Sequence, residues 1–343
     1  MIDISSLNKY DPSGMHKIYD RWPELARKSY ETDHVTIDFK NIDNIIFSGM
    51  GGSGAIGDVL ESIFSQTKIH VSTVKGYVLP KTVDSNSLII IISVSGNTDE
   101  TLSILKQAND IGCKIISISS GGIIEKFSQE NNIVHFKSKL YHSPRVSFIS
   151  FLYVILNFLL PILPLDQKDI DESLIELENM SKLINSTNLV PENPSLFLAE
   201  SIHGIPLIYS PSGLRSAAIR FKNSIQENVK SHVIVEDIIE SCHNGIESWE
   251  RKSEVVPIFI MGQDDHFKTK ERWRILKEYL SHKDIDYNEI VSIKGNILSK
   301  LVTLIYLLDY ASIYMAILSK VDPSPINAIN FIKSYLNSTN SST

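Results

Sequence analysis

Two short segments of the chain combine glycines with hydroxyl side chains in a way that suits phosphate binding. The first is Gly49-Met50-Gly51-Gly52-Ser53-Gly54-Ala55-Ile56-Gly57, and the second is Ser93-Val94-Ser95-Gly96-Asn97-Thr98-Asp99-Glu100-Thr101. Each follows an apolar run and precedes an amphipathic stretch, so each is predicted to lead from a strand into a helix. Glycines let backbone N–H groups approach an anion closely, and a helix N-terminus favours negative charge. The predicted phosphate-binding residues are Gly51, Gly52, Ser53, Ser93, Ser95 and Thr98.

Other interpretations of these segments compete with phosphate binding. A Walker P-loop is excluded, because the first segment has no Gly-Lys-Ser/Thr. That segment does satisfy Gly-x-Gly-x-x-Gly, but the strand about 20 residues later, His70 to Val74, has no acid to bind a dinucleotide ribose. In the second segment, Thr98 with Glu100 or Thr101 could simply cap a helix. The presence of both segments beside neighbouring strands favours a phosphomonoester pocket.

The two segments resemble the signature of SIS (sugar isomerase) domains. The longer run from Phe47 to Asp58 is similar to one branch in particular, the archaeal and bacterial bifunctional phosphoglucose/phosphomannose isomerases. Members of that branch have two SIS domains in a chain of about this length, so the resemblance covers nearly the whole sequence. It implies reversible isomerisation of glucose 6-phosphate, and of mannose 6-phosphate, with fructose 6-phosphate through a cis-enediol. It implies no metal and no cofactor.

The resemblance also gives roles to four catalytic residues. The segment Lys222–Lys230 has the family's Asn-x-x-x-Glu-x-x-Lys pattern, which makes Glu227 the base that moves a proton between C1 and C2. His243, in a His-Asn pair, would assist ring opening and reach into the neighbouring subunit of a homodimer. Arg145 would supply a fixed cation for the enediolate. Lys333, at the end of the C-terminal signature, would help ring opening.

Taken alone, these residues have more ordinary interpretations. Glu227 would be a solvated helix acid, His243 a structural hydrogen-bonding residue, and Arg145 a surface arginine. The chain also departs from the family pattern at two positions. Gly245 follows the His-Asn pair where members commonly carry an acid, and Ser324 stands where threonine is usual. The first departure would loosen the loop that holds His243.

The elements that must position these residues alternate along the chain, which predicts an α/β fold of two doubly wound parallel sheets of the SIS type. Each domain is expected to be a three-layer αβα sandwich. The apolar stretches Phe148–Leu165 and Leu301–Leu318 contain Asn157 and Asp309, so we expect buried core helices rather than membrane spans. Strands are predicted at 44–48, 69–74, 88–93, 114–118, 133–136, 205–209, 232–235, 255–261 and 288–292, and helices at 56–64, 99–111, 169–183, 213–230 and 266–282, with two more near the C-terminus.

The length of 343 residues predicts two domains, each able to bury a core. A more polar stretch separates the two runs of alternation. We therefore expect an N-terminal SIS domain at 1–165, a linker helix at 166–194 and a C-terminal SIS-like domain at 195–343.

Composition sets the wider context. With 33 Lys and Arg against 40 Asp and Glu, the net charge is −7, which argues against nucleic-acid or anionic-membrane partners. Hydrophobic residues make up 43% of the chain, as in folded globular proteins. Only Cys113 and Cys242 occur, which excludes a disulfide framework, and no signal peptide is recognised. A cytoplasmic location is expected.

Two other classes of function remain open at this point. SIS domains also occur in non-catalytic sugar-phosphate sensors, but such regulators usually carry a DNA-binding domain, and no basic domain precedes residue 40. An isomerase half of an aminosugar-forming amidotransferase would need an ammonia source, and no cysteine follows Met1.

Overall fold

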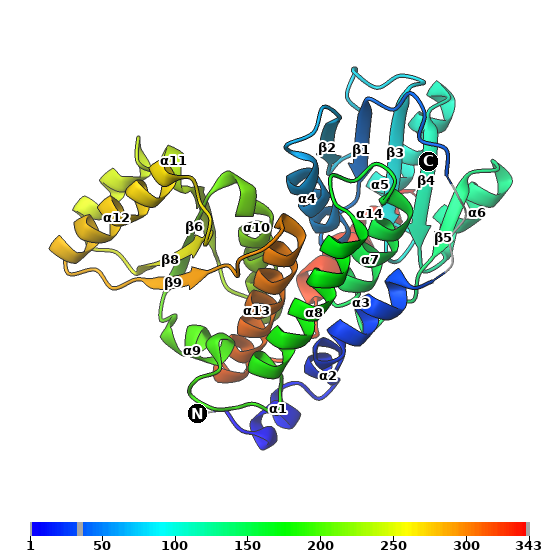
Figure 1. The fold of residues 1–343 in the computed structure, drawn as a ribbon. Coiled ribbons are helices and arrows are strands. Elements are labelled where there is room, and N and C mark those ends of the chain that lie inside the picture. Colours follow the sequence, from blue (N-terminus) through cyan, green and yellow to red (C-terminus); the bar gives the residue numbers. More distant parts are fainter. Residues whose placement is uncertain (1, 33–36, 341–343) are drawn as a thin grey trace.

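The computed structural model describes residues 2–32 and 37–340 of the chain. Figure 1 shows two twisted sheets side by side, with a group of helices between them. Every strand pairing in both sheets is parallel. The first sheet has the order β2-β1-β3-β4-β5 and the second β7-β6-β8-β9. The strands are β1 (Asn44–Ser48), β2 (His70–Val74), β3 (Ser87–Ser93), β4 (Lys114–Ser119), β5 (Val134–Lys137), β6 (Ile205–Ser210), β7 (Ile234–Asp237), β8 (Val255–Met261) and β9 (Asn288–Val291).

The order of the first sheet places a topological switch between β1 and β3. The chain leaves β1 to one side, forms β2, and then crosses to the other side of β1 to form β3. Ligands of open parallel sheets bind at such switch points, beyond the carboxyl ends of the strands. Both glycine- and hydroxyl-rich segments of the sequence lie there, because one follows β1 and the other follows β3.

The two sheets share one central layer of helices. Along β1, Ile45 and Phe47 belong to a large core that continues through the central helices to Ile208 and Ile258 of the second sheet. The side chain between them, Ile46, packs instead into a separate core on the outer face. The outer face of the second sheet has its own core as well. Each sheet is therefore covered by helices on both faces, which confirms the predicted αβα layers.

The helices divide accordingly. Those in contact with the central core come from both halves of the chain, and those on the outer faces are amphipathic crossover helices. The helices are α1 (Ile4–Tyr10), α2 (Met15–Asp20), α3 (Trp22–Tyr30), α4 (Gly52–Phe64), α5 (Asp99–Ile111), α6 (Gly122–Glu130), α7 (Phe148–Leu159), α8 (Gln167–Ile184), α9 (Pro194–Ser201), α10 (Arg215–Ser224), α11 (Ile238–Ser241), α12 (Phe267–His282), α13 (Ile297–Leu318) and α14 (Asn327–Asn340).

Several element boundaries differ from those predicted. Helix α5 has the predicted bounds, whereas α4 begins at Gly52 rather than at Ile56. Its early glycines are needed for close packing, since a Cβ at Gly54 would lie 2.7 Å from the carbonyl oxygen of Gly49. Helices α1, α2, α3, α6, α9 and α11 were not predicted, because each is at most 9 residues long.

The two apolar stretches form α7 and α13, and both are buried as predicted. Helix α13 is long and apolar enough to cross a membrane, but 94% of its most apolar window is buried inside the protein. Its central acid, Asp309, is fully buried and pairs with Arg220 of α10 at 2.7 Å. An ion pair of this kind suits a protein interior better than a lipid environment.

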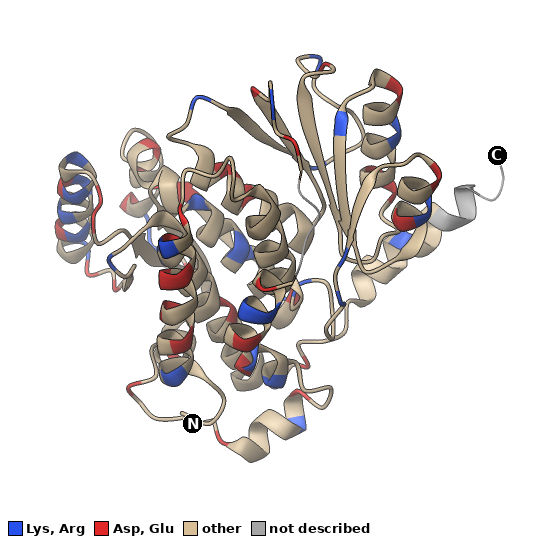
Figure 2. Ribbon diagram, turned by 45° about the vertical axis from the view of Figure 1, so that its right-hand side comes forward, with Lys and Arg blue, Asp and Glu red and all other residues tan. Residues whose placement is uncertain are grey.

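Basic and acidic residues are interspersed along the outer helices in Figure 2. Helix α14 differs from the others, because all of its side chains from 327 to 336 are exposed. Its exposed apolar residues Phe331, Ile332, Tyr335 and Leu336 recur at helical spacing and so share one face.

Candidate active site

The β3–α5 loop forms a compact hydroxyl-lined cradle at the switch point. The hydroxyl groups of Ser93 and Thr98 lie 3.1 Å apart, and Ser93 Oγ accepts the backbone N–H of Gly96 at 3.1 Å. The β1–α4 turn joins this cradle, since Ser53 Oγ accepts the backbone N–H of Val94 at 3.3 Å. The structure therefore brings together Ser53, Ser93 and Thr98, while Ser95 is exposed at the edge of the loop.

Thr98 is the N-cap residue of α5, but its side chain makes no capping hydrogen bond. Its hydroxyl faces Ser93 instead. The buried hydroxyl of Thr101 in the first turn of α5 has no hydrogen-bond partner among residues 2–32 and 37–340. The capping arrangement considered for Thr98 and Thr101 is therefore absent from the described structure. The N–H groups at this helix end are not satisfied by a side chain, as anion binding requires.

Two glycines allow the loops to approach each other. Gly96 has φ +70, and a Cβ at this position would lie 1.7 Å from the carbonyl oxygen of Gly121. Gly52 packs against the loop before α7, where a Cβ would lie 3.1 Å from the Cα of Arg145. The close approach of Gly52 brings the predicted phosphate loops next to the arginine of the predicted site.

Arg145 and Glu227 form an ion pair between the two halves of the molecule. Arg145 Nη1 lies 3.0 Å from Glu227 Oε2, although the two residues are 82 positions apart in the chain. The Arg145 side chain is only 4% exposed, and that of Glu227 is 25% exposed. Nε of Arg145 donates to Asn228 Oδ1 at 2.9 Å, and Nη2 donates to the carbonyl oxygens of Pro323 and Ser324 at 2.7 and 3.3 Å.

These contacts leave part of each charged group available. Four of the five N–H donors of Arg145 have acceptors in the protein, and the second N–H of Nη1 has none within the described residues. The other carboxylate oxygen of Glu227, Oε1, also lacks a hydrogen-bond partner in that part of the chain. This carboxylate oxygen of Glu227 can accept a proton from a carbon atom of a bound molecule. The Arg145 guanidinium, fixed by its hydrogen bonds, can stabilise the negative charge that forms nearby.

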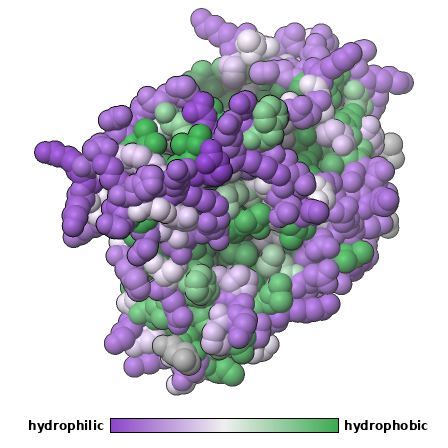
Figure 3. Space-filling model, turned by 60° about the vertical axis from the view of Figure 1, so that its left-hand side comes forward, coloured by the Kyte–Doolittle hydropathy of each residue, from purple (hydrophilic) through white to green (hydrophobic). Residues whose placement is uncertain are grey.

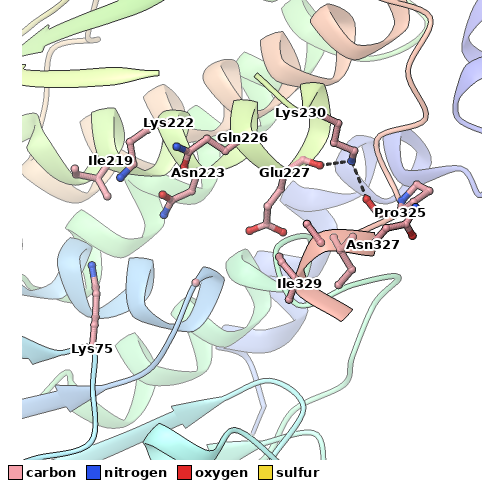
Figure 4. Close-up of a pocket in the computed structure, with 13 residues that line it drawn as sticks. Lys75, Ile219, Lys222, Asn223, Gln226, Glu227, Lys230, Pro325, Asn327 and Ile329 are labelled. Atoms are coloured by element: carbon pink, nitrogen blue, oxygen red, sulfur yellow. Dashed lines mark hydrogen bonds between the residues drawn. The ribbon is translucent and has the colours of Figure 1, made fainter. Parts of the chain in front are cut away.

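Glu227 points from its helix into a cavity of about 730 Å³ between the halves of the molecule, with Lys75 on the opposite wall (Figure 4). A cavity of this size holds a small phosphorylated sugar easily. Gly51 of the β1–α4 turn also lines it, which connects the cavity to the phosphate loops. The lining residues are Gly51, Lys75, Ile219, Lys222, Asn223, Gln226, Glu227, Lys230, Pro325, Ile326, Asn327, Ala328 and Ile329.

Glu227 lies in a single π-helical turn, Ile225–Val229, that extends α10. Such turns are rare and often occur at functional sites. The turn ends at Lys230, which has φ +64, and the Lys230 ammonium group donates to the carbonyl oxygens of Glu227, Pro323 and Pro325. Burial lowers the pKa of Lys230, and the positive charge of Arg145 acts in the same direction. Lys230 thus holds the segment before α14 against the helix end.

His243 and Lys333 are not brought to this cavity within one chain. Both side chains are exposed, neither lines the cavity, and neither makes a hydrogen bond or ion pair within the described residues. His243 lies between α11 and a 3₁₀ helix (Gly245–Glu250) in the second half. A Cβ at Gly245 would lie 2.4 Å from Glu236 Oε2, so a larger residue at this position requires the Glu236 side chain to move. Burial raises the pKa of that Glu236 carboxyl group.

Sequence reasoning missed several polar residues of the site, among them Lys75, Asn228 and Lys230. Lys75 follows β2 directly, at the same carboxyl edge as the phosphate loops, and pairs with Asp58 at 2.6 Å. Its position after a parallel strand was the available signal. Asn228 and Lys230 stand next to the predicted base, but nothing in the pattern shows which way they point. Across the described residues, no group of three or more His, Cys, Asp or Glu side chains could hold a metal ion.

Comparison with known proteins gives this arrangement a family context. Residues 191–336 match the model of the bacterial phospho-glucose isomerase C-terminal SIS domain, and residues 38–137 match the SIS domain. The bifunctional phosphoglucose/phosphomannose isomerase of Caldicellulosiruptor bescii is 32% identical, covering 92% of this chain and 96% of that protein. The protein of the same name from Aquifex aeolicus is 30% identical, covering 90% and 94%. A crystal structure of a hypothetical protein from Thermus thermophilus has a TM-score of 0.75 at 15% identity, covering 98% of this chain and 92% of that one, and so shares the fold.

Proposed function

Because the chain belongs to the family of bifunctional phosphoglucose/phosphomannose isomerases, we propose that it interconverts fructose 6-phosphate with glucose 6-phosphate and with mannose 6-phosphate. It is then an aldose–ketose isomerase that works through a cis-enediol. The observation that carries this proposal is the ion pair between Glu227 and Arg145, in which Arg145 holds one carboxylate oxygen and the Glu227 side chain points into the cavity.

In the proposed mechanism the phosphate of the substrate binds at the switch point, to Gly51, Gly52, Ser53 and the hydroxyl groups of the β3–α5 loop. The uncapped N-terminus of α5 and the hydroxyl pair of Ser93 and Thr98 support this role. Anchoring one end of an open-chain hexose leaves its first two carbons to lie in the cavity beside Glu227. That anchoring also fixes which part of the sugar can reach the base.

Glu227 Oε1 then removes the proton from one of the two carbons and returns it to the other. A single carboxylate can serve both positions, because they are adjacent atoms of an opened sugar. Negative charge develops on the enediolate oxygen. Arg145 does not itself line the cavity, but its guanidinium, with Nη1 3.0 Å from the base, stabilises that charge electrostatically. Burial of the guanidinium strengthens this effect, since water screens it little.

The same base accounts for both aldoses. Glucose 6-phosphate and mannose 6-phosphate differ only at C2, so they share one enediol. Rotation about the C2–C3 bond of the open chain presents either face of C2 to Glu227. The 730 Å³ cavity leaves room for such a rotation.

The experiment that tests the function is incubation of the purified protein with fructose 6-phosphate, followed by chromatography of the hexose products. Glucose and mannose 6-phosphates should both accumulate, with solvent deuterium at C2 when the reaction runs in D₂O. Binding without deuterium incorporation would identify a non-catalytic sugar-phosphate sensor instead. Full activity should persist in EDTA, whereas a loss that zinc restores would contradict the proposed metal-independent, cofactor-free route.

We further propose that the enzyme is a homodimer in which His243 completes the neighbouring site and assists ring opening there. Three observations support this: the exposed imidazole of His243, which has no partner among residues 2–32 and 37–340, the apolar face of α14, and the apolar patches between hydrophilic side chains on the surface in Figure 3. Lys333 also lies on α14, but away from its apolar face, and we propose that it helps ring opening from that side of the helix.

Complementation between two inactive variants tests the shared site. Glu227→Gln and His243→Ala homodimers should each be inactive, but subunit exchange should restore about a quarter of wild-type activity, because half of a random mixture is hybrid and each hybrid has one intact site. No recovery after demonstrated exchange would show that Glu227 and His243 act within one subunit. An active monomer would contradict the dimer itself.

The proposed setting is the cytoplasm, where hexose phosphates are metabolised. The two cysteines, Cys113 and Cys242, are both unpaired in the structure, as suits a reducing compartment.

A further inference from the structure

Asn228 is a polar residue in a position that normally holds an apolar one. It is fully buried between the π-helical turn and α13, and it follows the predicted base directly in the chain. Burial of an amide is unfavourable unless its hydrogen bonds are made. Both ends of this amide have partners, so its orientation is fixed by the protein.

Each partner of Asn228 defines one half of its amide group. Arg145 Nε–H can only donate, so the atom that faces it at 2.9 Å must be the amide oxygen. The amide nitrogen in turn donates to Ser312 Oγ of α13 at 2.8 Å, and that hydroxyl donates to the carbonyl oxygen of Asp309 at 2.6 Å. The line of hydrogen bonds from Arg145 thus ends on the backbone of a buried helix.

The backbone of Arg145 is held from the same helix by a separate route. Its carbonyl oxygen accepts a hydrogen bond from Arg220 Nη2 at 2.6 Å, and Arg220 is paired with the Asp309 carboxylate. Ser224 Oγ also donates to that carboxylate, at 2.6 Å. Arg220 therefore fixes the position of the Arg145 backbone, while Asn228 fixes the orientation of the Arg145 guanidinium plane.

The π-helical turn explains how one guanidinium meets two consecutive side chains. Neighbouring side chains on an α-helix point about 100° apart, which would separate Glu227 from Asn228. The wider turn reduces that angle, so Glu227 reaches Nη1 and Asn228 reaches Nε of the same planar group. If the guanidinium rotated, its contact with Glu227 Oε2 would be lost. The carboxylate of Glu227 would then no longer be held in its orientation toward the cavity.

We propose that Asn228 is a positioning residue for the proton transfer: it orients the Arg145 guanidinium, and through it the carboxylate of Glu227. This inference rests on the proposed function of the site. Neither Asn228 nor Arg145 lines the cavity, so Asn228 acts on the substrate only through Arg145 and, in turn, Glu227. It should therefore affect kcat and leave the affinity for fructose 6-phosphate almost unchanged.

The test is Asn228→Leu, which keeps the approximate size of the side chain and removes both hydrogen bonds. A displacement of about 1 Å in a catalytic group can reduce a rate about 100-fold, so we expect kcat to fall 30- to 100-fold. The dissociation constant of fructose 6-phosphate should stay within about threefold of wild type. The matched control is Asn193→Leu, since Asn193 is also fully buried with both ends of its amide hydrogen-bonded, but it caps α9 away from the cavity. The control should lose stability and keep its kcat.

A second variant covers the case in which Asn228→Leu does not fold. Ser312→Ala removes only the group that fixes the Asn228 amide, and it should lower kcat about three- to tenfold with unchanged affinity. A wild-type kcat in folded Asn228→Leu, or in Ser312→Ala if the former is unfolded, would overturn the positioning role. Lack of turnover by the wild-type protein would instead overturn the proposed function, so the two failures are distinguishable.

Discussion

Replacing Glu227 with glutamine tests the central step of the proposed mechanism, because it changes the chemistry of one group while keeping its size. The glutamine oxygen can still accept the hydrogen bond from Arg145 Nη1, which in the wild-type protein measures 3.0 Å to the carboxylate. Arg145 also keeps its other acceptors, Asn228 and the carbonyl oxygens of Pro323 and Ser324. The cavity should therefore retain its shape in this variant.

The expected loss of activity can be bounded from these contacts. An amide cannot take a proton from carbon, so the variant loses the whole contribution of the general base, about 10²- to 10⁴-fold in kcat. At 1.36 kcal/mol per tenfold, that loss equals about 3–5 kcal/mol of transition-state stabilisation. Glu227 is 25% exposed, so its charge is partly solvated and the free energy of unfolding should fall by only about 1 kcal/mol. Affinity for fructose 6-phosphate should change by less than about threefold.

The assay is NMR-monitored exchange of the C1 protons of fructose 6-phosphate in D₂O, which detects proton removal even when no product is released. The matched control is Glu178→Gln, which alters another Arg–Glu pair, with Arg27 at 2.7 Å on the surface. That control should exchange at the wild-type rate. A folded Glu227→Gln protein that keeps more than about a tenth of the wild-type exchange rate would remove Glu227 from the mechanism.

Three further predictions concern stability. Asp309→Asn leaves Arg220 with a neutral partner in a site where both side chains are at most 2% exposed. Urea denaturation should therefore show that the free energy of unfolding falls by about 3–5 kcal/mol. A decrease below about 1 kcal/mol would contradict the importance of the ion pair. Burial lowers the pKa of His135, so as the pH falls the His135 imidazole takes up a proton more readily in the unfolded chain than in the folded one. The contribution of neutral His135 to stability should be fully present above about pH 6.5 and should be lost as the pH falls below that value. His135→Gln should reduce this loss of stability in melting curves measured at different pH values. Gly96→Ala should lower the free energy of unfolding by at least about 3 kcal/mol and abolish sugar-phosphate binding, because its Cβ would overlap a backbone carbonyl group. The control is Gly112→Ala, since Gly112 has a similar φ of +80 but open space around it. Calorimetry should show a loss of only about 1–2 kcal/mol for this control, and binding should be kept.

The parts of the fold that follow from local pattern were predictable from the sequence. The isoleucine run of β3 is apolar at every position because helices cover both of its faces, and α5 shows clear helical periodicity. Helices α1, α2 and α3 span at most 9 residues each, so their periodicity alone does not distinguish them from loops. They are defined by packing on distant elements, as in the hydrogen bond from Trp22 to the carbonyl oxygen of Val146.

The site was predictable only in part, for a related reason. The phosphate loops are contiguous in sequence, so their glycines and hydroxyl groups could be recognised together. The contact between Arg145 and Glu227 joins residues from different halves of the chain, and the resemblance to known isomerases named both without giving their distance. The π-helical turn and the role of Asn228 depend on hydrogen bonds to α13, which no local pattern encodes.

The continuous apolar interior beneath both sheets limits how a gene for this protein can change by recombination. If recombination replaced one half with an SIS domain from another protein, the new half would have to be complementary to many core side chains of the remaining half. Without that complementarity, an apolar surface would be exposed and the protein would tend to aggregate. The two halves are therefore expected to be inherited together. A substitution in the shared core of one half should be retained only when it fits the core side chains of the other half.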